Sequence, residues 1–478
     1  MTESDEATAL LSERKKRKSY KTYFARFVVS ILLCMNTGLS GYILATFVSI
    51  WKFSKDFFDA DAMAINMLAM IFMVLYIPGS LLSIFITERY GMSIALLLGA
   101  AMNALGCWVR YGGSDTVSDT DAKYFLVMLG QVIAALGQPL ITNTPSRISN
   151  DWFPTEERNI AMFFMVQANA IGGGLGALIP SYQVRDRADI IDVLFWQAIA
   201  GTAIAVITAI FVQERPPTPP GRDVERQLAL QPSHNTREAL HIMYTSLAQF
   251  RTMLTNFNFN VLLTGFSLLL GVGLVLFGVV GQVINPCGYS AREAGLAAAF
   301  LTFSGVLSNI AVVAILSYVT ITHHVTVQKG LFLWSLVTVV MCLASNRPNS
   351  IETVLLCWTL CGVALGPLVP VCLETGVEIV YPIPGEAVAA LMLTGLSTVA
   401  VLLSLLVTPL LKLEVSTECD RIVTPAAIVL IGVAGMGVLF GLFVRADLRR
   451  SQAAYDTDEE EERGTMPPDR SEETVGEI

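Results

Sequence analysis

Apolar residues along this chain gather in runs of about 20 residues, separated by short polar stretches. A helix of about 20 apolar residues is long enough to cross a hydrocarbon core of roughly 30 Å, so each run predicts a membrane-spanning helix. Twelve spans are expected, near 25–47, 63–86, 93–111, 124–145, 160–182, 193–213, 260–284, 294–317, 329–345, 353–375, 387–411 and 422–444. The pattern predicts an all-α polytopic membrane protein.

Composition and charge agree with that prediction. The chain is 53% hydrophobic and 15% charged, whereas soluble domains carry about 25% charged residues. The first run follows a charged tail and has no small-residue cleavage site, which favours a retained helix over a signal peptide. An even number of spans puts both ends on one side, and about two thirds of the 31 Lys and Arg residues fall on that side. Both termini are therefore predicted to be cytoplasmic.

The longest internal polar stretch divides the spans six and six. The expected parts are a cytoplasmic N-terminal tail 1–24, a six-helix bundle 25–213, a cytoplasmic linker 214–259, a second bundle 260–445 and an acidic, disordered cytoplasmic tail 446–478. Within the linker, apolar residues recur at steps of three and four: Leu240, Met243, Leu247, Phe250 and Leu254. They predict a helix lying along the membrane surface or, with nearly equal standing, a short helix packed on the bundle.

A turn motif occurs once in each half. WFPTEERNIAM follows the fourth span, and VYPIPGEAVAAL follows the tenth; both place an aromatic residue, then proline, then an acid. Proline ends a helix, and an acidic residue is favoured near the N-terminus of the next one. The charged insert after the fourth span is therefore interpreted as a hairpin repeated in both halves.

Two six-helix halves joined by a long loop resemble the major facilitator superfamily. The loop between spans two and three adds Gly79 and the run Glu88-Arg89-Tyr90-Gly91, which is similar to that family's Gly-x-x-x-Asp-Arg-x-Gly loop. The usual basic pair after it is replaced by Met92-Ser93. The resemblance implies paired bundles that expose a central site to either side in turn.

Two further segments, GQVIAALGQPLITNTPSRISNDWF and LETGVEIVYPIPGEA, resemble the feline leukaemia virus subgroup C receptor-related transporters of solute carrier family 49, as does ERPPTPP. The resemblance implies transport of choline and ethanolamine, of haem, or of pyridoxine as in a lysosomal relative. We expect facilitative transport of a small organic solute, either of the choline and ethanolamine type or another neutral or weakly charged metabolite. The alternatives are a haem or pyridoxine transporter, a channel, and a receptor without transport.

The same resemblance implies a choline site made of a first-helix Trp, a seventh-helix Tyr and several amides. The amide positions match Gln138 and Asn169, but the aromatic positions fall near Leu44 and Leu274 and a third amide position near Ser397. A quaternary ammonium depends on aromatic faces, so this departure weakens choline binding. The substrate-binding candidates are Gln138, Asn169, Tyr42, which needs a shifted register, Gln282 and Ser397.

The centres of the predicted spans contain no Asp, Glu, Lys, Arg or His, which argues against proton coupling in the membrane. The four histidines, His234, His241, His323 and His324, are placed in cytoplasmic loops. We expect no metal, cofactor, catalytic residue or nucleic-acid partner, and a monomer. Six of the eight cysteines lie in apolar spans, and Cys287 and Cys419 lie in loops on the opposite side. Two unpaired loop thiols are favoured over a disulfide.

Charged residues near the cytoplasmic ends are candidates for a gate. We expect contacts between the halves from Glu88, Arg89, Arg147, Glu157, Glu374 and Glu378, although such residues also serve as ordinary anchors. In the N-terminal tail, Glu6, Leu10 and Leu11 fit an acidic dileucine signal. Such a signal predicts adaptor-protein binding and an endosomal, lysosomal or vacuolar membrane, with the plasma membrane as the default.

Overall fold

The computed structural model describes residues 21–220, 236–316, 324–414 and 424–445. These residues form helices with no strand among them, and twelve of the helices are long and apolar enough to cross a membrane. The predicted all-α polytopic fold is confirmed. Residues of the dileucine pattern and of both chain ends lie outside the described ranges.

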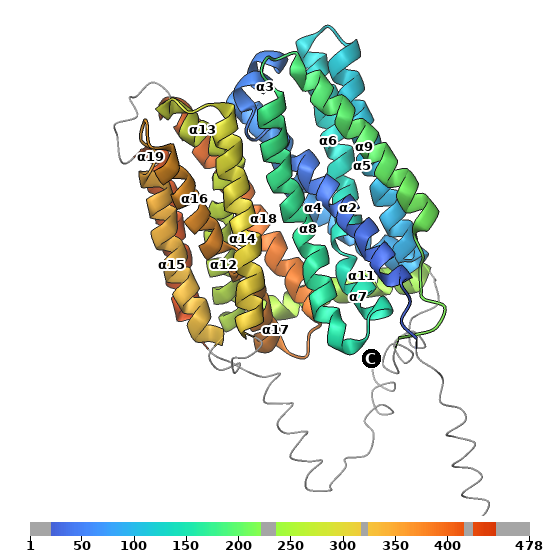
Figure 1. Ribbon diagram of the computed structural model, residues 1–478. Helices are drawn as coiled ribbons and strands as arrows, with labels where there is room; N and C mark the ends of the chain where they lie inside the picture. Colours follow the sequence, from blue (N-terminus) through green and yellow to red (C-terminus); the bar gives the residue numbers. More distant parts are fainter. Residues whose placement is uncertain (1–20, 221–235, 317–323, 415–423, 446–478) are drawn as a thin grey trace, which may run out of the picture.

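The spanning helices form two bundles of six (Figure 1). The first bundle consists of α2 (Ala25–Ala45), α4 (Ala62–Tyr90), α5 (Met92–Thr116), α6 (Thr120–Thr142), α8 (Thr155–Gln183) and α9 (Asp189–Phe211). The second consists of α12 (Phe257–Gly278), α14 (Ala291–Leu316), α15 (His324–Ala344), α16 (Ile351–Leu365), α18 (Gly385–Glu414) and α19 (Pro425–Phe443). Shorter helices complete them: α3 (Trp51–Phe58), α7 (Pro145–Trp152), α11 (Thr236–Thr255), α13 (Val280–Ile284), η1 (Asn285–Cys287) and α17 (Leu368–Val380).

The two bundles repeat one packing pattern. Helix α2 packs on α8 as α12 packs on α18, and α5 packs on α6 and α9 as α15 packs on α16 and α19. The bundles meet along two symmetric helix pairs, α8 with α14 and α4 with α18. This arrangement confirms the twofold internal repeat predicted from the sequence.

Glycines allow α2 and α8 to touch through their backbones. A Cβ added to Gly172 would overlap the backbone of Gly38, and a Cβ added to Gly41 would overlap the carbonyl of Asn169. Small residues permit such close approach of membrane helices, where dispersion and interhelical hydrogen bonds replace the hydrophobic effect. The packing fixes Asn169 beside α2.

The repeated turn motif ends a helix in both halves. Helix α7 ends at Trp152 and α8 starts after Pro154. In the second half α17 ends at Val380, the Tyr381–Pro382 peptide is cis, and α18 starts at Gly385. The predicted turns are confirmed. The fourth span continues beyond its predicted end at residue 145, because the short helix α7 starts at Pro145. Proline is tolerated in the first turn of a helix, where its missing N–H would have no partner in any case.

The two ends of the bundles are distinct in Figure 1. Helices α7, α11 and α17 lie at the end where α2 starts and α19 ends, here called the terminal face, and α3 and α13 lie at the opposite, distal face. At the distal face Cys287 is disulfide-bonded, whereas the six cysteines within the spans are free. The expectation of an unpaired thiol at Cys287 is wrong; Cys419 lies outside the described residues.

Candidate functional site

Two amides expected from the sequence lie on adjacent parts of the first bundle. Gln138 on α6 is 8% exposed, and its side chain makes no hydrogen bond to the residues that the structure describes. Asn169 on α8 is half-buried and donates from Nδ2 to the Thr37 carbonyl of α2 at 3.2 Å. The Gln138 amide atoms are not among the enclosed polar atoms that lack a partner, so they stay accessible to a polar ligand.

The positions where the resemblance implies aromatic rings lie where the bundles meet. Leu44 of α2 and Leu274 of α12 are partly buried and pack against the same hydrophobic cluster. Phe277 lies one turn beyond Leu274 on α12, and its Cζ would be 3.8 Å from a Cβ on Gly173 of α8. Sequence reasoning missed Phe277, although a spacing of three residues places it on the same helix face as Leu274.

The other three predicted binding residues take different positions. Tyr42 lies beside Gln197 of α9 and Arg110 of α5, inside the first bundle. Ser397 is half-buried on α18. Gln282 of α13 is 6% exposed and bonded to a residue of the first bundle. Gln282 therefore belongs to the contact between the bundles, and the binding role of Gln138 and Asn169 stays a prediction.

Neutral side chains join the two bundles toward the distal face. Gln282 Nε2 donates to Asn66 Oδ1 at 2.6 Å, and Asn66 Nδ2 lies 2.9 Å from Thr408 Oγ1 and 3.4 Å from Gln282 Oε1. We call Asn66, Gln282 and Thr408 the distal amide cluster; each is at most 9% exposed. Beside it Trp51 Nε1 donates to Asn285 Oδ1 at 3.4 Å. One exposed ion pair, Lys412 with Asp61 at 3.9 Å, lies at the rim.

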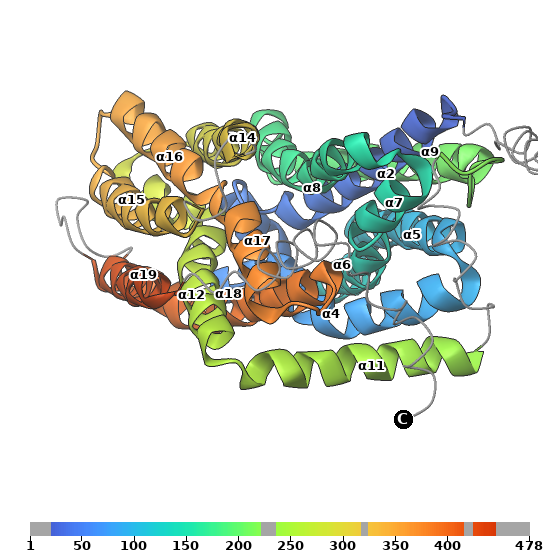
Figure 2. The same cartoon turned by 90° about the horizontal axis from the view of Figure 1, so that it is seen from below.

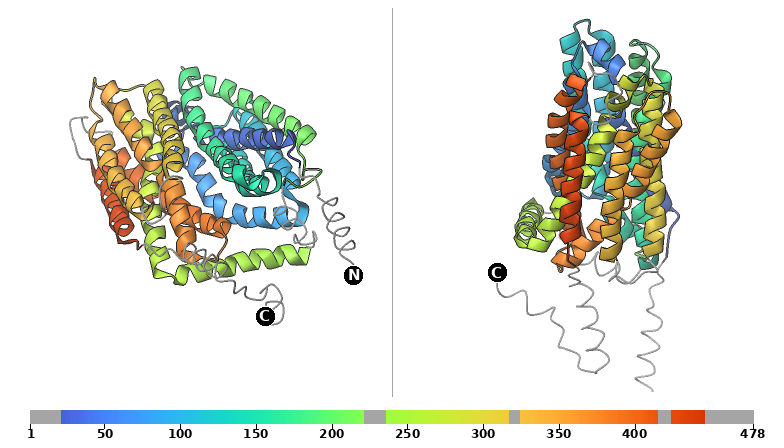
Figure 3. Two further views of the ribbon diagram at one scale, coloured as in Figure 1. Left: turned by 60° about the horizontal axis from the view of Figure 1, so that its bottom comes forward. Right: turned by 90° about the vertical axis from the view of Figure 1, so that its left-hand side faces the viewer.

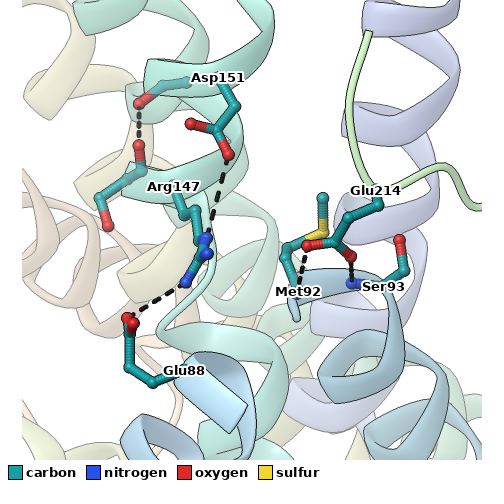
Figure 4. Close-up of polar contacts among 8 residues, drawn as sticks. Glu88, Met92, Ser93, Arg147, Asp151 and Glu214 are labelled. Atoms are coloured by element: carbon teal, nitrogen blue, oxygen red, sulfur yellow. Dashed lines mark hydrogen bonds and ion pairs between the residues drawn. The ribbon is translucent and has the colours of Figure 1, made fainter. Parts of the chain in front are cut away.

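At the terminal face, charged residues of the first bundle contact one another. Arg147 of α7 lies 3.2 Å from Glu88 of α4 and 3.9 Å from Asp151 (Figure 4). Glu157 of α8 pairs with Arg26 of α2 at 2.8 Å. These pairs hold the ends of four helices of one bundle together.

The remaining gating candidates have contacts elsewhere on the terminal face. Arg89 Nε donates to Thr236 Oγ1 of α11 at 2.9 Å. In the second bundle Glu374 of α17 lies 3.6 Å from His324 Nδ1, and Glu378 is 4% exposed. His324 was expected in a loop but is the first residue of α15. The contacts described for the six candidates lie within one bundle or reach α11, and their role between the halves stays a prediction.

Glu214 is a terminal-face residue that sequence reasoning did not single out. Its carboxylate accepts from the backbone N–H groups of Met92 at 2.9 Å and Ser93 at 2.6 Å, at the start of α5 (Figure 4). Gly91, with φ +93°, turns the chain there, and a Cβ would lie 2.7 Å from the carboxylate. A carboxylate at a helix N-terminus satisfies unpaired donors and complements the helix dipole. Its place in ERPPTPP was the available signal.

Arg110 is a second residue that the sequence did not reveal. It lies six residues before the end of α5, is fully buried, and its guanidinium stands 5.2 Å from the centre of the Phe47 ring. Its polar neighbours in the described part of the chain are the Cys107 thiol and the Tyr42 hydroxyl, and no acidic residue is among them. The predicted third span ends at 111, so Arg110 lies outside the span centre, which is the part of the span that was searched for charges.

Comparison with known proteins gives a consistent result. The family model of the Major Facilitator Superfamily matches residues 27–380. The choline/ethanolamine transporter FLVCR2 of Homo sapiens is 24% identical, over 92% of this chain and 82% of that protein. FLVCR1 of Mus musculus, also a choline/ethanolamine transporter, is 24% identical over 89% and 76% of the two chains. Solute carrier family 49 member A3 of Danio rerio is 24% identical over 93% and 92%.

Solved structures with the same fold include sugar transporters. A crystal structure of a D-xylose-proton symporter has a TM-score of 0.66 and 15% identity, over 88% of this chain and 98% of that one. An inward-open structure of the xylose transporter XylE from E. coli has a TM-score of 0.58 and 14% identity, over 88% and 95%. At these identities the likeness establishes the arrangement of helices.

Proposed function

Because the chain belongs to the major facilitator superfamily, we propose that it is a facilitative, alternating-access carrier of a small organic solute. It is an integral multi-pass membrane transporter related to the choline/ethanolamine transporters FLVCR1 and FLVCR2. The observation that supports the proposal is Gln138, an amide that is 8% exposed, to which no described residue hydrogen-bonds, and whose polar atoms are not enclosed by the protein. A solute with a hydroxyl, amine or carbonyl group satisfies it.

Phe277 extends the site toward solutes that carry an ammonium group. Its ring approaches Gly173 of α8 across the contact between the bundles, on the helix face that also carries Leu274. A cation over an aromatic face gains about 0.5–2 kcal/mol, depending on how dry the site is. The resemblance implies two aromatic rings around a quaternary ammonium, and Phe277 supplies one ring. A primary amine is favoured over a quaternary ammonium here, because it can also donate hydrogen bonds to Gln138.

The uneven contacts between the bundles support alternating access. The distal amide cluster joins them at one face, while the described ion pairs of Arg147 and Glu157 at the other face stay inside the first bundle. Neutral hydrogen bonds in membrane proteins average about 0.6 kcal/mol, so the distal contact can break during a transport cycle. Rocking of one bundle against the other then exposes the central amides to the distal side.

The terminal face is proposed to be cytoplasmic. The disulfide at Cys287 supports this orientation, because disulfides persist in oxidising compartments and Cys287 lies at the distal face. The excess of Lys and Arg on the terminal side agrees with it. The proposed orientation places the distal amide cluster on the non-cytoplasmic side.

Uptake into proteoliposomes tests the function. Labelled ethanolamine, choline, pyridoxine and haem are each supplied to vesicles that hold the purified full-length chain. We expect saturable uptake of ethanolamine that accelerates when unlabelled ethanolamine is trapped inside, as an exchanging carrier requires. Saturable uptake of haem alone would overturn the proposed substrate class, and flux that never saturates would overturn the carrier in favour of a channel.

A further inference from the structure

Helix α11 is the longest described helix that is not among the twelve candidate membrane spans. Its first residue, Thr236, accepts a hydrogen bond from Arg89 at the end of α4, and at its other end Asn260 of α12 donates to the Leu254 carbonyl at 2.7 Å. Between these points α11 also contacts α18 of the second bundle. It therefore runs along the terminal ends of spanning helices from both bundles (Figures 2 and 3).

One side of α11 packs on the protein. Met253 is fully buried, Phe250 packs against the core of the second bundle, and Ile242, Met243 and Gln249 are partly buried. These positions recur at three to four residues and so form one face of the helix. The apolar pattern predicted from the sequence is split, because Leu240, Leu247 and Leu254 point elsewhere.

The exposed surface of α11 consists of two strips. The apolar strip is 38%, 65%, 39% and 48% exposed at Leu240, Tyr244, Leu247 and Leu254. The polar strip is formed by the exposed His241, Thr245 and Thr252. At about 100° per residue, the packed face, the apolar strip and the polar strip point in three directions roughly 120° apart. A helix with three such faces can contact protein, lipid and water at the same time.

We propose that the apolar strip of α11 is seated in the bilayer leaflet that borders the terminal face, at the boundary between headgroups and acyl chains. The strip continues a surface that already faces lipid, because α4, which α11 contacts, exposes Leu82 and Ile77 in the half that leads to the terminal face. Exposed Arg251 lies within the strip, where its long side chain can reach phosphate groups while its stem stays apolar.

The level of the helix supports a lipid partner over a protein one. Both ends of α11 are bonded to the terminal-face ends of the candidate spanning helices α4 and α12, so its axis lies at the level where these helices end. At that depth an apolar strip beside α4 and α18 meets acyl chains before it meets any soluble protein. The polar strip, turned by roughly a third of a turn, then meets water.

Two neighbouring positions make a matched test. Tyr244→Cys and Thr245→Cys carry a nitroxide label in the full-length protein in phosphatidylcholine vesicles, with the label on the unsubstituted protein as background. Collisions with oxygen, which partitions into lipid, and with a water-soluble nickel chelate are measured. We expect a severalfold higher oxygen-to-chelate ratio at position 244 than at 245.

The alternatives give different results in the same experiment. If the chelate collides more often than oxygen with the label at both positions, the strip faces water and the proposal is overturned. Protection of position 244 from both reagents means that another part of the chain covers the strip, which overturns it equally. The test does not depend on transport, so its failure leaves the proposed function standing.

A second pair of variants measures stability in a bilayer. In nanodiscs, Leu247→Glu places a charge in the strip and is expected to lower the melting temperature, whereas Thr245→Glu on the polar strip leaves it unchanged. In detergent micelles the difference between the two variants is expected to shrink, because detergent headgroups adapt around a charge. An equal effect of both variants in nanodiscs contradicts a lipid-seated strip.

Discussion

At the scale of single residues, Gln138 and Gln131 show how position on one helix separates function from structure. They lie two turns apart on α6, and both are nearly or fully buried. Gln131 Nε2 donates to the Leu68 carbonyl of α4 at 2.9 Å, and its Oε1 is enclosed among protein atoms. No described residue hydrogen-bonds to the Gln138 side chain, which is 8% exposed and whose amide atoms are not among the enclosed ones. Gln138 is therefore the better placed of the two to bind a solute.

Replacing Gln138 with Ala is therefore expected to weaken transport without unfolding the protein. Loss of one hydrogen bond to the solute, worth about 1 kcal/mol, raises KM roughly fivefold. Saturable uptake into proteoliposomes and the melting temperature are measured together. The matched Gln131→Ala variant is expected to lower the melting temperature with KM unchanged, and the reverse pattern would remove Gln138 from the site.

Arg110 leads to a different prediction, because its charge lies inside the bundle beside the Phe47 ring and the Cys107 thiol, with no acidic residue among its described neighbours. Replacement of an uncompensated buried ion by an apolar residue of similar volume is often neutral or stabilising, by about 1–4 kcal/mol. Arg110→Met is expected to keep or raise the melting temperature. In contrast, Gly130→Ala should lower it, since the added Cβ would lie 2.5 Å from Arg110 Cγ. A marked loss of stability in Arg110→Met would reveal a partner for the charge.

The residue scale also marks what the sequence could and could not reveal about the site. Gln138 and Asn169 were found because their segments resemble a known family. The partnership of Asn66 with Gln282 was not, because the two are separated by 216 residues and either amide alone reads as a polar residue in a span. Arg110 and Glu214 were missed for a similar reason, since a charge near a predicted helix end gives no sign of what it touches.

At the scale of elements, the spans and the repeated turns were predictable, because apolar length and proline act locally. Three helix breaks were not predictable, because they depend on packing between helices. They lie between α6 and α7, between α12 and α13, and between α16 and α17. The start of α5 shows such a dependence: its first N–H groups are satisfied by Glu214, which is more than 120 residues away in the chain.

Glu214→Ala is expected to destabilise the start of α5. Loss of a capping carboxylate costs about 1 kcal/mol, within a usual range of 0.5–2. Thermal unfolding in nanodiscs measures the loss, and hydrogen exchange at Met92 and Ser93 localises it. Glu214→Asp keeps the charge but shortens the reach, so an intermediate effect is expected. Unchanged exchange at α5 in the alanine variant would contradict the capping role.

At the scale of the whole molecule, the distal amide cluster makes closure at one face depend on neutral groups. Its members are buried, so salt has little access to them, and the exposed Asp61–Lys412 pair at 3.9 Å contributes little because solvent screens it. Opening at the distal face is therefore expected to be nearly insensitive to ionic strength. The distal hydrogen bonds between the bundles are each weak, so breaking them when the distal face opens costs little free energy.

Asn66→Ala removes every hydrogen bond that Asn66 makes in this cluster and should shift the molecule toward opening at the distal face. At about 0.6 kcal/mol for each of its three bonds the shift is roughly twentyfold. Spin labels at Asp61→Cys and Lys412→Cys, both exposed at the rim, report the separation of α4 and α18 by pulsed resonance. We expect a longer-distance population to grow in the Asn66→Ala background. Asn103→Ala, which removes a buried amide inside the first bundle, should leave the distances unchanged, and so should 1 M salt. An identical distance distribution with and without Asn66 would show that closure rests on the apolar contact of the helices alone.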